Sequence, residues 1–341
     1  MGTLLGSAAE AAGAEQLLRE GRQHDLGCRA AEAMECYAAV IDLTGEPRLR
    51  AEALRRLGVL HHLRAEPDIA RELCQRSCDI AVQAGDHDLA ADACNALAGF
   101  ALERGDLTEA QERYQHALEL AAENSALVAK VEQNLGIVAN IRGDWADALA
   151  HYSRSLAAYE ASADERGCAF AHHNLGMIHA DQKRWAEADR HYQTSQALAI
   201  SAGDRHLGGI ALMNRAEVRL AQGDNEGARA GAEQALAIFT QVEARRHKAG
   251  AHRLLGMVFH HQNQLSLAES HLRAALEIAA SACCPLIEAD AAKELATLYE
   301  QEGRRGDAIG LLTLARELYS QLKARVDLGE VEQRIEALQA A

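Results

Sequence analysis

The chain has 341 residues, of which 48% are hydrophobic but only 4% are aromatic, and it contains 3 prolines. This composition is typical of an all-helical protein whose core is built from alanine and leucine, and the length exceeds what one ordinary compact core uses. The formal net charge of −15 argues against general binding to nucleic acid or to an anionic membrane, because both require clustered Lys and Arg.

Residues 1–13 precede the first repeat and are expected to form a flexible N-terminal extension. They lack the positively charged start of a secretion signal, and nowhere does the sequence approach the ~20 apolar residues of a transmembrane helix. We therefore expect a cytoplasmic protein with no membrane association. In that compartment the 8 cysteines are expected to be free thiols.

A period of about 40 residues runs through residues 14–325. Small residues mark the period at Gly21, Gly58, Ala98, Gly136, Gly176, Ala216, Gly256 and Ala296. Twelve residues after each of them stands an alanine, at Ala33, Ala70, Ala110, Ala148, Ala188, Ala228, Ala268 and Ala308. A tyrosine follows four residues later in four of the repeats, at Tyr37, Tyr114, Tyr152 and Tyr192. The pattern predicts eight repeats.

Helix-stop and helix-start signals lie between the two small sites of a repeat. Gly105 and Gly143 suit the left-handed conformation that follows a helix, and the next residues, Asp106 and Asp144, can cap the following helix. Glu109 would complete a capping box with Asp106. Each repeat is therefore predicted to be a helix, a tight turn and an antiparallel helix, with the small residue of the first helix facing the alanine of the second.

The last segment, residues 326–341, predicts a capping helix. Glu336 stands where the repeat pattern would place a small residue, and a polar side chain suits a helix on which nothing further packs. One hairpin cannot bury both of its faces, so the repeats must stack on one another. The predicted fold is an all-α, right-handed α-solenoid of about eight helix-turn-helix repeats with a C-terminal capping helix.

The repeat resembles that of the tetratricopeptide-repeat (TPR) family. That family's motif has Leu and a small residue on the first helix, Gly at the turn, and Ala, an aromatic and Ala on the second helix. In the fourth repeat these positions hold Leu135, Gly136, Gly143, Ala148, Tyr152 and Ser155. The period of 40 is longer than the usual ~34 and is similar to the repeats of kinesin light chain, of Pins-type adaptors and of some bacterial regulators that sense peptides or small ligands.

A row of asparagines recurs without a packing reason. Asn134, Asn174 and Asn214 lie two residues before the small site at a strict spacing of 40, and Asn95 lies one place earlier in its own repeat. An amide both donates and accepts, so stacked asparagines can hydrogen-bond the backbone of an extended peptide. The resemblance to kinesin light chain and Pins-type repeats implies that such a row lies on a concave face lined by the first helices.

Further polar residues occupy neighbouring positions of the first helices: Arg55, Arg56, Lys130, His173 and Arg253. Each peptide hydrogen bond contributes only ~0.5–1.5 kcal/mol, so other contacts must supply the rest of the affinity. A partly basic lining made by these residues predicts a partner segment with acidic residues. The alternative is that they are ordinary solvated side chains.

The cysteines and histidines do not predict a metal centre. Cys74 and Cys78 have the i, i+4 spacing of metal ligands, but both fall at core positions of the repeat, where buried thiols are expected. The adjacent histidine pairs fall at different phases of the repeat, which argues against a shared metal site. These pairs are 61/62, 172/173 and 260/261. No metal or cofactor is predicted.

The sequence contains none of the common catalytic or phosphate-binding motifs. We therefore predict a non-enzymatic scaffold or adaptor that binds an extended peptide segment of a protein partner in its concave groove. The alternative is a regulatory protein that senses a peptide or another ligand and controls a partner's activity. An enzyme with an unrecognised site is a third hypothesis. The sequence leaves the oligomeric state open.

Overall fold

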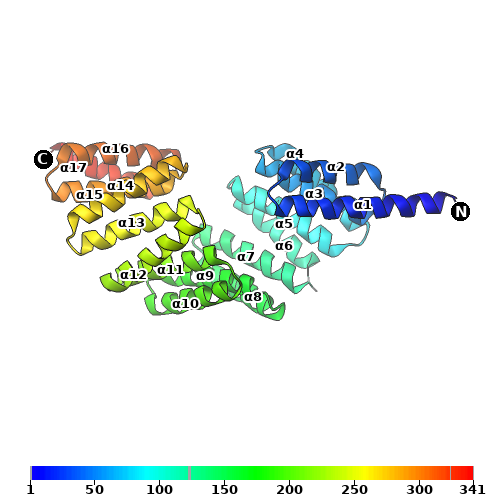
Figure 1. The fold of residues 1–341 in the computed structure, drawn as a ribbon, viewed down its shortest axis with the longest axis horizontal. Coiled ribbons are helices and arrows are strands. Elements are labelled where there is room, and N and C mark those ends of the chain that lie inside the picture. The colour runs from blue at the N-terminus through cyan, green and yellow to red at the C-terminus, as the bar shows by residue number, and fades with distance from the viewer. Residues whose placement is uncertain (1, 122–123, 323, 341) are drawn as a thin grey trace. The chain divides into compact units, whose positions relative to one another are not determined.

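A computed structural model describes residues 2–121, 124–322 and 324–340, and these residues form only α-helices joined by short turns (Figure 1). The all-α prediction is confirmed. The fold divides into two compact units, residues 1–167 and 168–341, and the division falls inside one helix.

The first unit holds eight complete helices. They are α1 (Gly2–Leu26), α2 (Ala30–Leu43), α3 (Pro47–Leu63), α4 (Pro67–Gln83), α5 (His87–Glu103), α6 (Leu107–Leu120), α7 (Ser125–Arg142) and α8 (Trp145–Ala161). Consecutive helices pack as hairpins, α1 with α2 and so on to α7 with α8. We call the first helix of each hairpin helix A and the second helix B.

The second unit begins within α9 (Glu165–Asp181) and continues the same pattern. Its other helices are α10 (Trp185–Ser201), α11 (Arg205–Ala221), α12 (Asn225–Gln241), α13 (Arg245–His261), α14 (Leu265–Ser281), α15 (Pro285–Gln301), α16 (Arg305–Leu322) and α17 (Arg325–Ala340). Among the described residues, none of these seventeen helices combines the length and hydrophobicity that a membrane span requires.

The repeating alanines of helix B are the most regular part of the core. All eight have no exposed surface: Ala33, Ala70, Ala110, Ala148, Ala188, Ala228, Ala268 and Ala308. These eight alanines are therefore core residues.

The small site of helix A has a different neighbour from the one predicted. A Cβ atom on Gly136 would lie 2.5 Å from the ring of Tyr152, and one on Gly176 would lie 2.7 Å from the ring of Tyr192. The closest atoms thus belong to the side chain four residues after the alanine. Glycine is needed here because a buried ring of helix B occupies the space above its backbone.

The structure explains why serine replaces alanine at a further small position of helix B. Ser155 is fully buried, and its hydroxyl donates a 2.8 Å hydrogen bond to the carbonyl oxygen of Ala129 in the helix A of the same hairpin. Ser77 and Ser195 make the equivalent bond in their own hairpins. Each bond satisfies a buried hydroxyl and ties helix B to helix A.

The predicted turn chemistry is partly confirmed. Gly105 and Gly143 both have φ of +81°, in the left-handed region. The Asp106 carboxylate accepts a 3.0 Å hydrogen bond from the Glu109 N–H, as expected of a cap. Asp144 makes no such bond. The capping box is wrong, because the Asp106 N–H donates to a backbone carbonyl of the preceding helix and the Glu109 carboxylate binds Arg113 at 2.7 Å.

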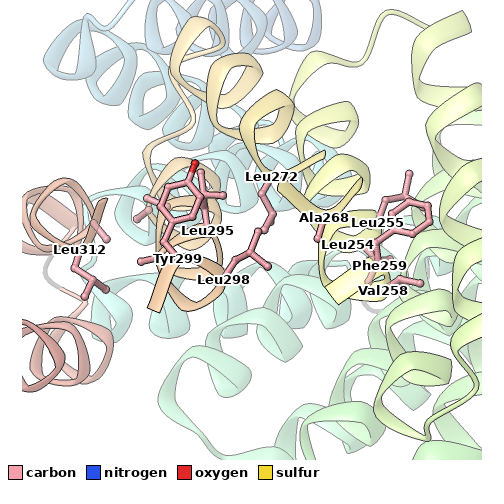
Figure 2. Close-up of a cluster of buried hydrophobic side chains, with 14 of the residues drawn as sticks. Leu254, Leu255, Val258, Phe259, Ala268, Leu272, Leu295, Leu298, Tyr299 and Leu312 are labelled. Atoms are coloured by element: carbon pink, nitrogen blue, oxygen red, sulfur yellow. The ribbon is translucent and has the colours of Figure 1, made fainter. Parts of the chain in front are cut away.

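One large hydrophobic cluster runs through α11 to α17 of the second unit. Figure 2 shows ten labelled side chains of this cluster, contributed by four consecutive helices: Leu254, Leu255, Val258, Phe259, Ala268, Leu272, Leu295, Leu298, Tyr299 and Leu312. The cluster is continuous because each hairpin buries its second face against the next one.

The chain ends extend this pattern. On α17, Val331 and Ile335 are buried in the same cluster while Glu336 is exposed, as expected of a capping helix. α17 starts at Arg325, one residue before the predicted boundary, and α1 runs through residue 13 without a break. The three-part division at residues 13 and 325 stays a prediction.

A pair of glycine variants tests the account of the hairpin contact. Gly136→Ala should destabilise the fold by about 1–3 kcal/mol, because its Cβ overpacks against the Tyr152 ring. Gly99→Ala is the matched control in a helix interior, where the nearest atom is the Tyr114 hydroxyl at 3.8 Å. It should be neutral or stabilising by up to ~1 kcal/mol. Equal destabilisation in urea unfolding would contradict this account.

Candidate peptide-binding face

Two of the predicted asparagines meet in the first unit. Asn95 on α5 and Asn134 on α7 are both partly exposed, and the Asn134 amide nitrogen donates a 2.9 Å hydrogen bond to the Asn95 oxygen. This bond uses one donor of Asn134 and one lone pair of Asn95. Both donors of Asn95 and one donor and the oxygen of Asn134 stay available for a ligand.

The other two asparagines lie in the second unit. Asn174 on α9 and Asn214 on α11 are also partly exposed. The Asn214 amide is hydrogen-bonded to the Tyr192 hydroxyl. Asn174 makes no side-chain hydrogen bond to another described residue, so its amide groups are unused in the part of the chain that the structure covers. The structure joins Asn95 to Asn134 and shows no bond between Asn174 and Asn214.

The two predicted arginines of the first unit, Arg55 and Arg56, are already paired with carboxylates. Arg55 on α3 lies 3.6 Å from Asp92 on α5, and Arg56 donates a 2.9 Å hydrogen bond to Glu52 one turn earlier. Burial alone would raise the pKa of Glu52, but hydrogen bonds from Arg22 and Arg56 bring it below its usual range. Glu52 is therefore ionised at neutral pH and offsets part of the positive charge.

The predicted basic residues of the second unit also carry little free charge. Arg253 lies 3.3 Å from the Glu217 carboxylate of the preceding helix A. Burial, with a smaller effect from His247, lowers the pKa of His173 to about 4, so this imidazole is neutral at pH 7. Of the five residues expected to make a basic lining, Lys130 is the exposed one for which no ion pair with a described residue is seen.

A pocket of about 450 Å³ lies beside the paired arginines of the first unit. Its walls are mostly apolar, with guanidinium groups among them, and are formed by Asp25, Cys28, Ala30, Arg55, Arg56, Val59, Leu60 and Leu63. Such a pocket can accept an apolar side chain whose neighbouring polar atoms reach the arginines. The apolar lining was not expected from the sequence.

Polar side chains also pair inside the hairpins at a spacing of 19 residues, which the sequence analysis missed. The pairs are Glu132 with His151 at 2.6 Å, His172 with His191 at 3.0 Å, and His252 with His271 at 3.1 Å, measured between side-chain oxygen and Nδ1 or between two Nδ1 atoms. The signal was present, because both members of each pair recur at multiples of 40 residues.

One histidine of each pair, His191 or His252, is neutral at pH 7. Burial, and to a smaller extent the neighbouring imidazole, lowers the pKa of His191 and of His252 to about 4. A neutral imidazole can donate with one nitrogen and accept with the other, so one N–H of each pair satisfies its partner. No group of three or more candidate metal ligands occurs among the described residues.

The architecture places the chain in the class of α-solenoid repeat proteins. The sequence pattern described as "Tetratricopeptide repeat" matches residues 49–123, 89–161, 126–201 and 209–281, which together span more than half of the chain. The chain belongs to the tetratricopeptide-repeat family. No curated protein matches it.

Solved structures of similar fold include two Rap proteins. RapI in its apo form is 14% identical with a TM-score of 0.61, and the match covers 78% of this chain and 97% of that one. A Rap protein complexed with competence and sporulation factor is 14% identical with a TM-score of 0.62, covering 98% of both chains.

A third similar structure is a signal-transduction ATPase with a tetratricopeptide-repeat sensor from Pyrococcus horikoshii. It is 16% identical with a TM-score of 0.71, and the match covers 96% of this chain but 50% of that one. At these identities the likeness concerns the fold alone.

The neutral histidines make stability depend on pH. The unfolded chain takes up protons near the ordinary histidine pKa of ~6.5, whereas folded His191 resists until about 4. The unfolded state therefore binds more protons in this window, and the free energy of unfolding falls as the pH falls through it.

His191→Asn removes one such group. Between about pH 7 and about pH 5, the free energy of unfolding of this variant should fall by ~1 kcal/mol less than that of the wild type, after discounting for partial exposure. His116→Asn, at an exposed position, should leave the pH dependence unchanged. Urea unfolding at each pH measures both. Equal losses in the wild type and His191→Asn would contradict the pairing.

Proposed function

We propose that this protein is a non-enzymatic scaffold whose A helices bind an extended segment of a protein partner. The observation that carries the proposal is the set of partly exposed asparagine amides on consecutive A helices, above all Asn174, whose amide bonds to no other side chain among the described residues. Packing gives no reason for these amides to recur, since the core positions next to them are apolar. The tetratricopeptide repeat is in general an interaction fold, which supports the same role.

The bonded asparagines are suited to a peptide backbone. The contact between Asn95 and Asn134 holds two amides in a fixed orientation before a ligand arrives, which reduces the entropy lost on binding. Their remaining donors and acceptors match the alternating N–H and C=O groups of an extended chain. The identity of the side chains of the bound segment then matters little where the asparagines contact its backbone. The apolar pocket beside Arg55 is proposed to select one apolar side chain of that segment.

The expected preference for acidic residues becomes a secondary part of the proposal. An acidic side chain of the partner that binds Arg55 or Arg253 must displace Asp92 or Glu217. The loss of the existing ion pair offsets much of the binding free energy of the new one. Lys130 is exposed and has no competing carboxylate among the residues that the structure describes. We therefore propose that acidic residues add modestly to an affinity dominated by amide contacts and apolar burial.

A regulatory role is the second candidate. Its support is the division of the fold into two compact units within α9, because a ligand can change the arrangement of two such units more readily than that of one. The Rap protein complexed with a factor and the ATPase with a repeat sensor have the same fold. In this case the bound peptide would control another protein.

Amide variants test the peptide-binding face. A peptide selected from a random display library against the full chain provides the probe. Asn174→Ala with Asn214→Ala should weaken its binding by about 1–3 kcal/mol, the value of two lost hydrogen bonds. The free energy of unfolding should fall by no more than the ~0.5–1.5 kcal/mol of the Asn214 bond to Tyr192. The control is Gln193→Ala, which removes an exposed amide from helix B of the same hairpin. If the control weakens binding as much as the double variant, the proposed face is wrong.

Small-angle scattering separates the scaffold from the regulator. With a saturating amount of the same selected peptide, the scaffold predicts a radius of gyration that changes no more than the added mass requires. A change well beyond that value would favour the regulator, because a ligand shifts a conformation only when it binds the two states unequally.

A further inference from the structure

Two thiols from neighbouring repeats meet in the core of the first unit. Cys78 on α4 and Cys94 on α5 have their Sγ atoms 3.2 Å apart, and their exposed fractions are 7% and 3%. A disulfide bond needs ~2.0 Å between the sulfur atoms. An approach of ~1.2 Å would therefore suffice to reach bonding distance.

The pair has the chemistry of an attacking and a resolving thiol. The hydrogen bond with Cys94 lowers the pKa of Cys78, although burial opposes this effect. The nearby Arg113 guanidinium acts in the same direction as the hydrogen bond, while the Asp79 carboxylate opposes it. The same hydrogen bond and burial raise the pKa of Cys94. Cys78 is thus the thiolate that attacks, since the thiolate is the nucleophilic form.

We propose that Cys78 and Cys94 form a redox-active dithiol site, in which a peroxide converts the two thiols into a disulfide that joins α4 to α5. The Cys78 thiolate attacks one oxygen of hydrogen peroxide, the O–O bond breaks, and hydroxide leaves, which gives a sulfenic acid. The Cys94 thiol then attacks that sulfur, the S–O bond breaks, and the proton and hydroxyl leave as water. The peroxide gains two electrons, one from each thiol.

The disulfide would act on the junction between the second and third repeats. It would connect helix B of one hairpin to helix A of the next, where the fold otherwise relies on side-chain packing. Asn95 directly follows Cys94, so the restrained helix carries one of the bonded amides. The dithiol chemistry does not depend on whether that amide binds a peptide, and the two proposals can fail separately.

Mass spectrometry of the full chain tests the site. Folded protein is treated with increasing hydrogen peroxide, quenched with catalase, alkylated in denaturant and digested without reductant. We expect a peptide pair linked through Cys78 and Cys94, and a loss of two alkylatable thiols from the 8 present. The urea midpoint of unfolding should rise on oxidation and return on reduction, because the cross-link restricts the unfolded chain.

Single variants identify the roles of the two thiols. Cys94→Ser, whose hydroxyl can replace the Cys94 hydrogen bond to Cys78, should leave a Cys78 sulfenic acid that dimedone traps, and Cys78→Ala should abolish both products. Cys74→Ala is the matched control, since Cys74 is a fully buried thiol one turn earlier on α4 that donates to a backbone carbonyl. The Cys74→Ala variant should still give the peptide pair linked through Cys78 and Cys94 after oxidation.

Circular dichroism checks that each variant is folded. If a variant does not fold, the digest of the oxidised wild-type protein alone tests whether Cys78 and Cys94 form a disulfide. The proposal is overturned if Cys78 and Cys94 remain alkylatable after the exposed Cys28 and Cys283 have been oxidised.

Discussion

The close contact between the small residue of helix A and the side chain opposite it on helix B is the constraint on which this structure depends. Where this small residue is glycine, as at Gly136, a buried side chain of helix B fills the space above the backbone. The two helices approach closely, and the hairpin presents two faces that both need cover. Stacking of hairpins follows, because no single hairpin can bury the surface it exposes.

This packing leaves some helix A positions free for binding. The leucines and small residues of helix A point into the core, whereas the asparagines and their neighbours stay partly exposed. A recurring exposed amide costs the fold little and gains nothing from packing, which is why we connect it with a ligand. Arg55 and Arg253 are weaker evidence for a ligand than the asparagines. Their charges are already stabilised within the fold by Asp92 and Glu217, so no binding partner is needed to explain them.

The repeat pattern of the sequence predicted the features that recur at the same position of each repeat. It did not predict which side chains contact one another across two helices. The buried alanines, the left-handed glycines and the capping helix all follow from local signals repeated in register. The carboxylate partner of Arg55 lies 37 residues away on another helix, and the thiol partner of Cys78 belongs to the next repeat. Repetition reveals which positions are alike, but it does not reveal which side chains meet across two helices. The capping box failed for a local reason, because Arg113, one turn later on the same helix, binds the Glu109 carboxylate.

The central claim is that the recurring asparagines bind the backbone of a partner segment. Nuclear magnetic resonance of the side-chain amides tests it most directly, since each asparagine gives its own pair of signals. On addition of a selected peptide, the account predicts shifts for Asn95, Asn134, Asn174 and Asn214, with little change at Asn124 and Asn263 in the turns. Shifts confined to the turn asparagines, with the four helix A amides unmoved, would contradict it.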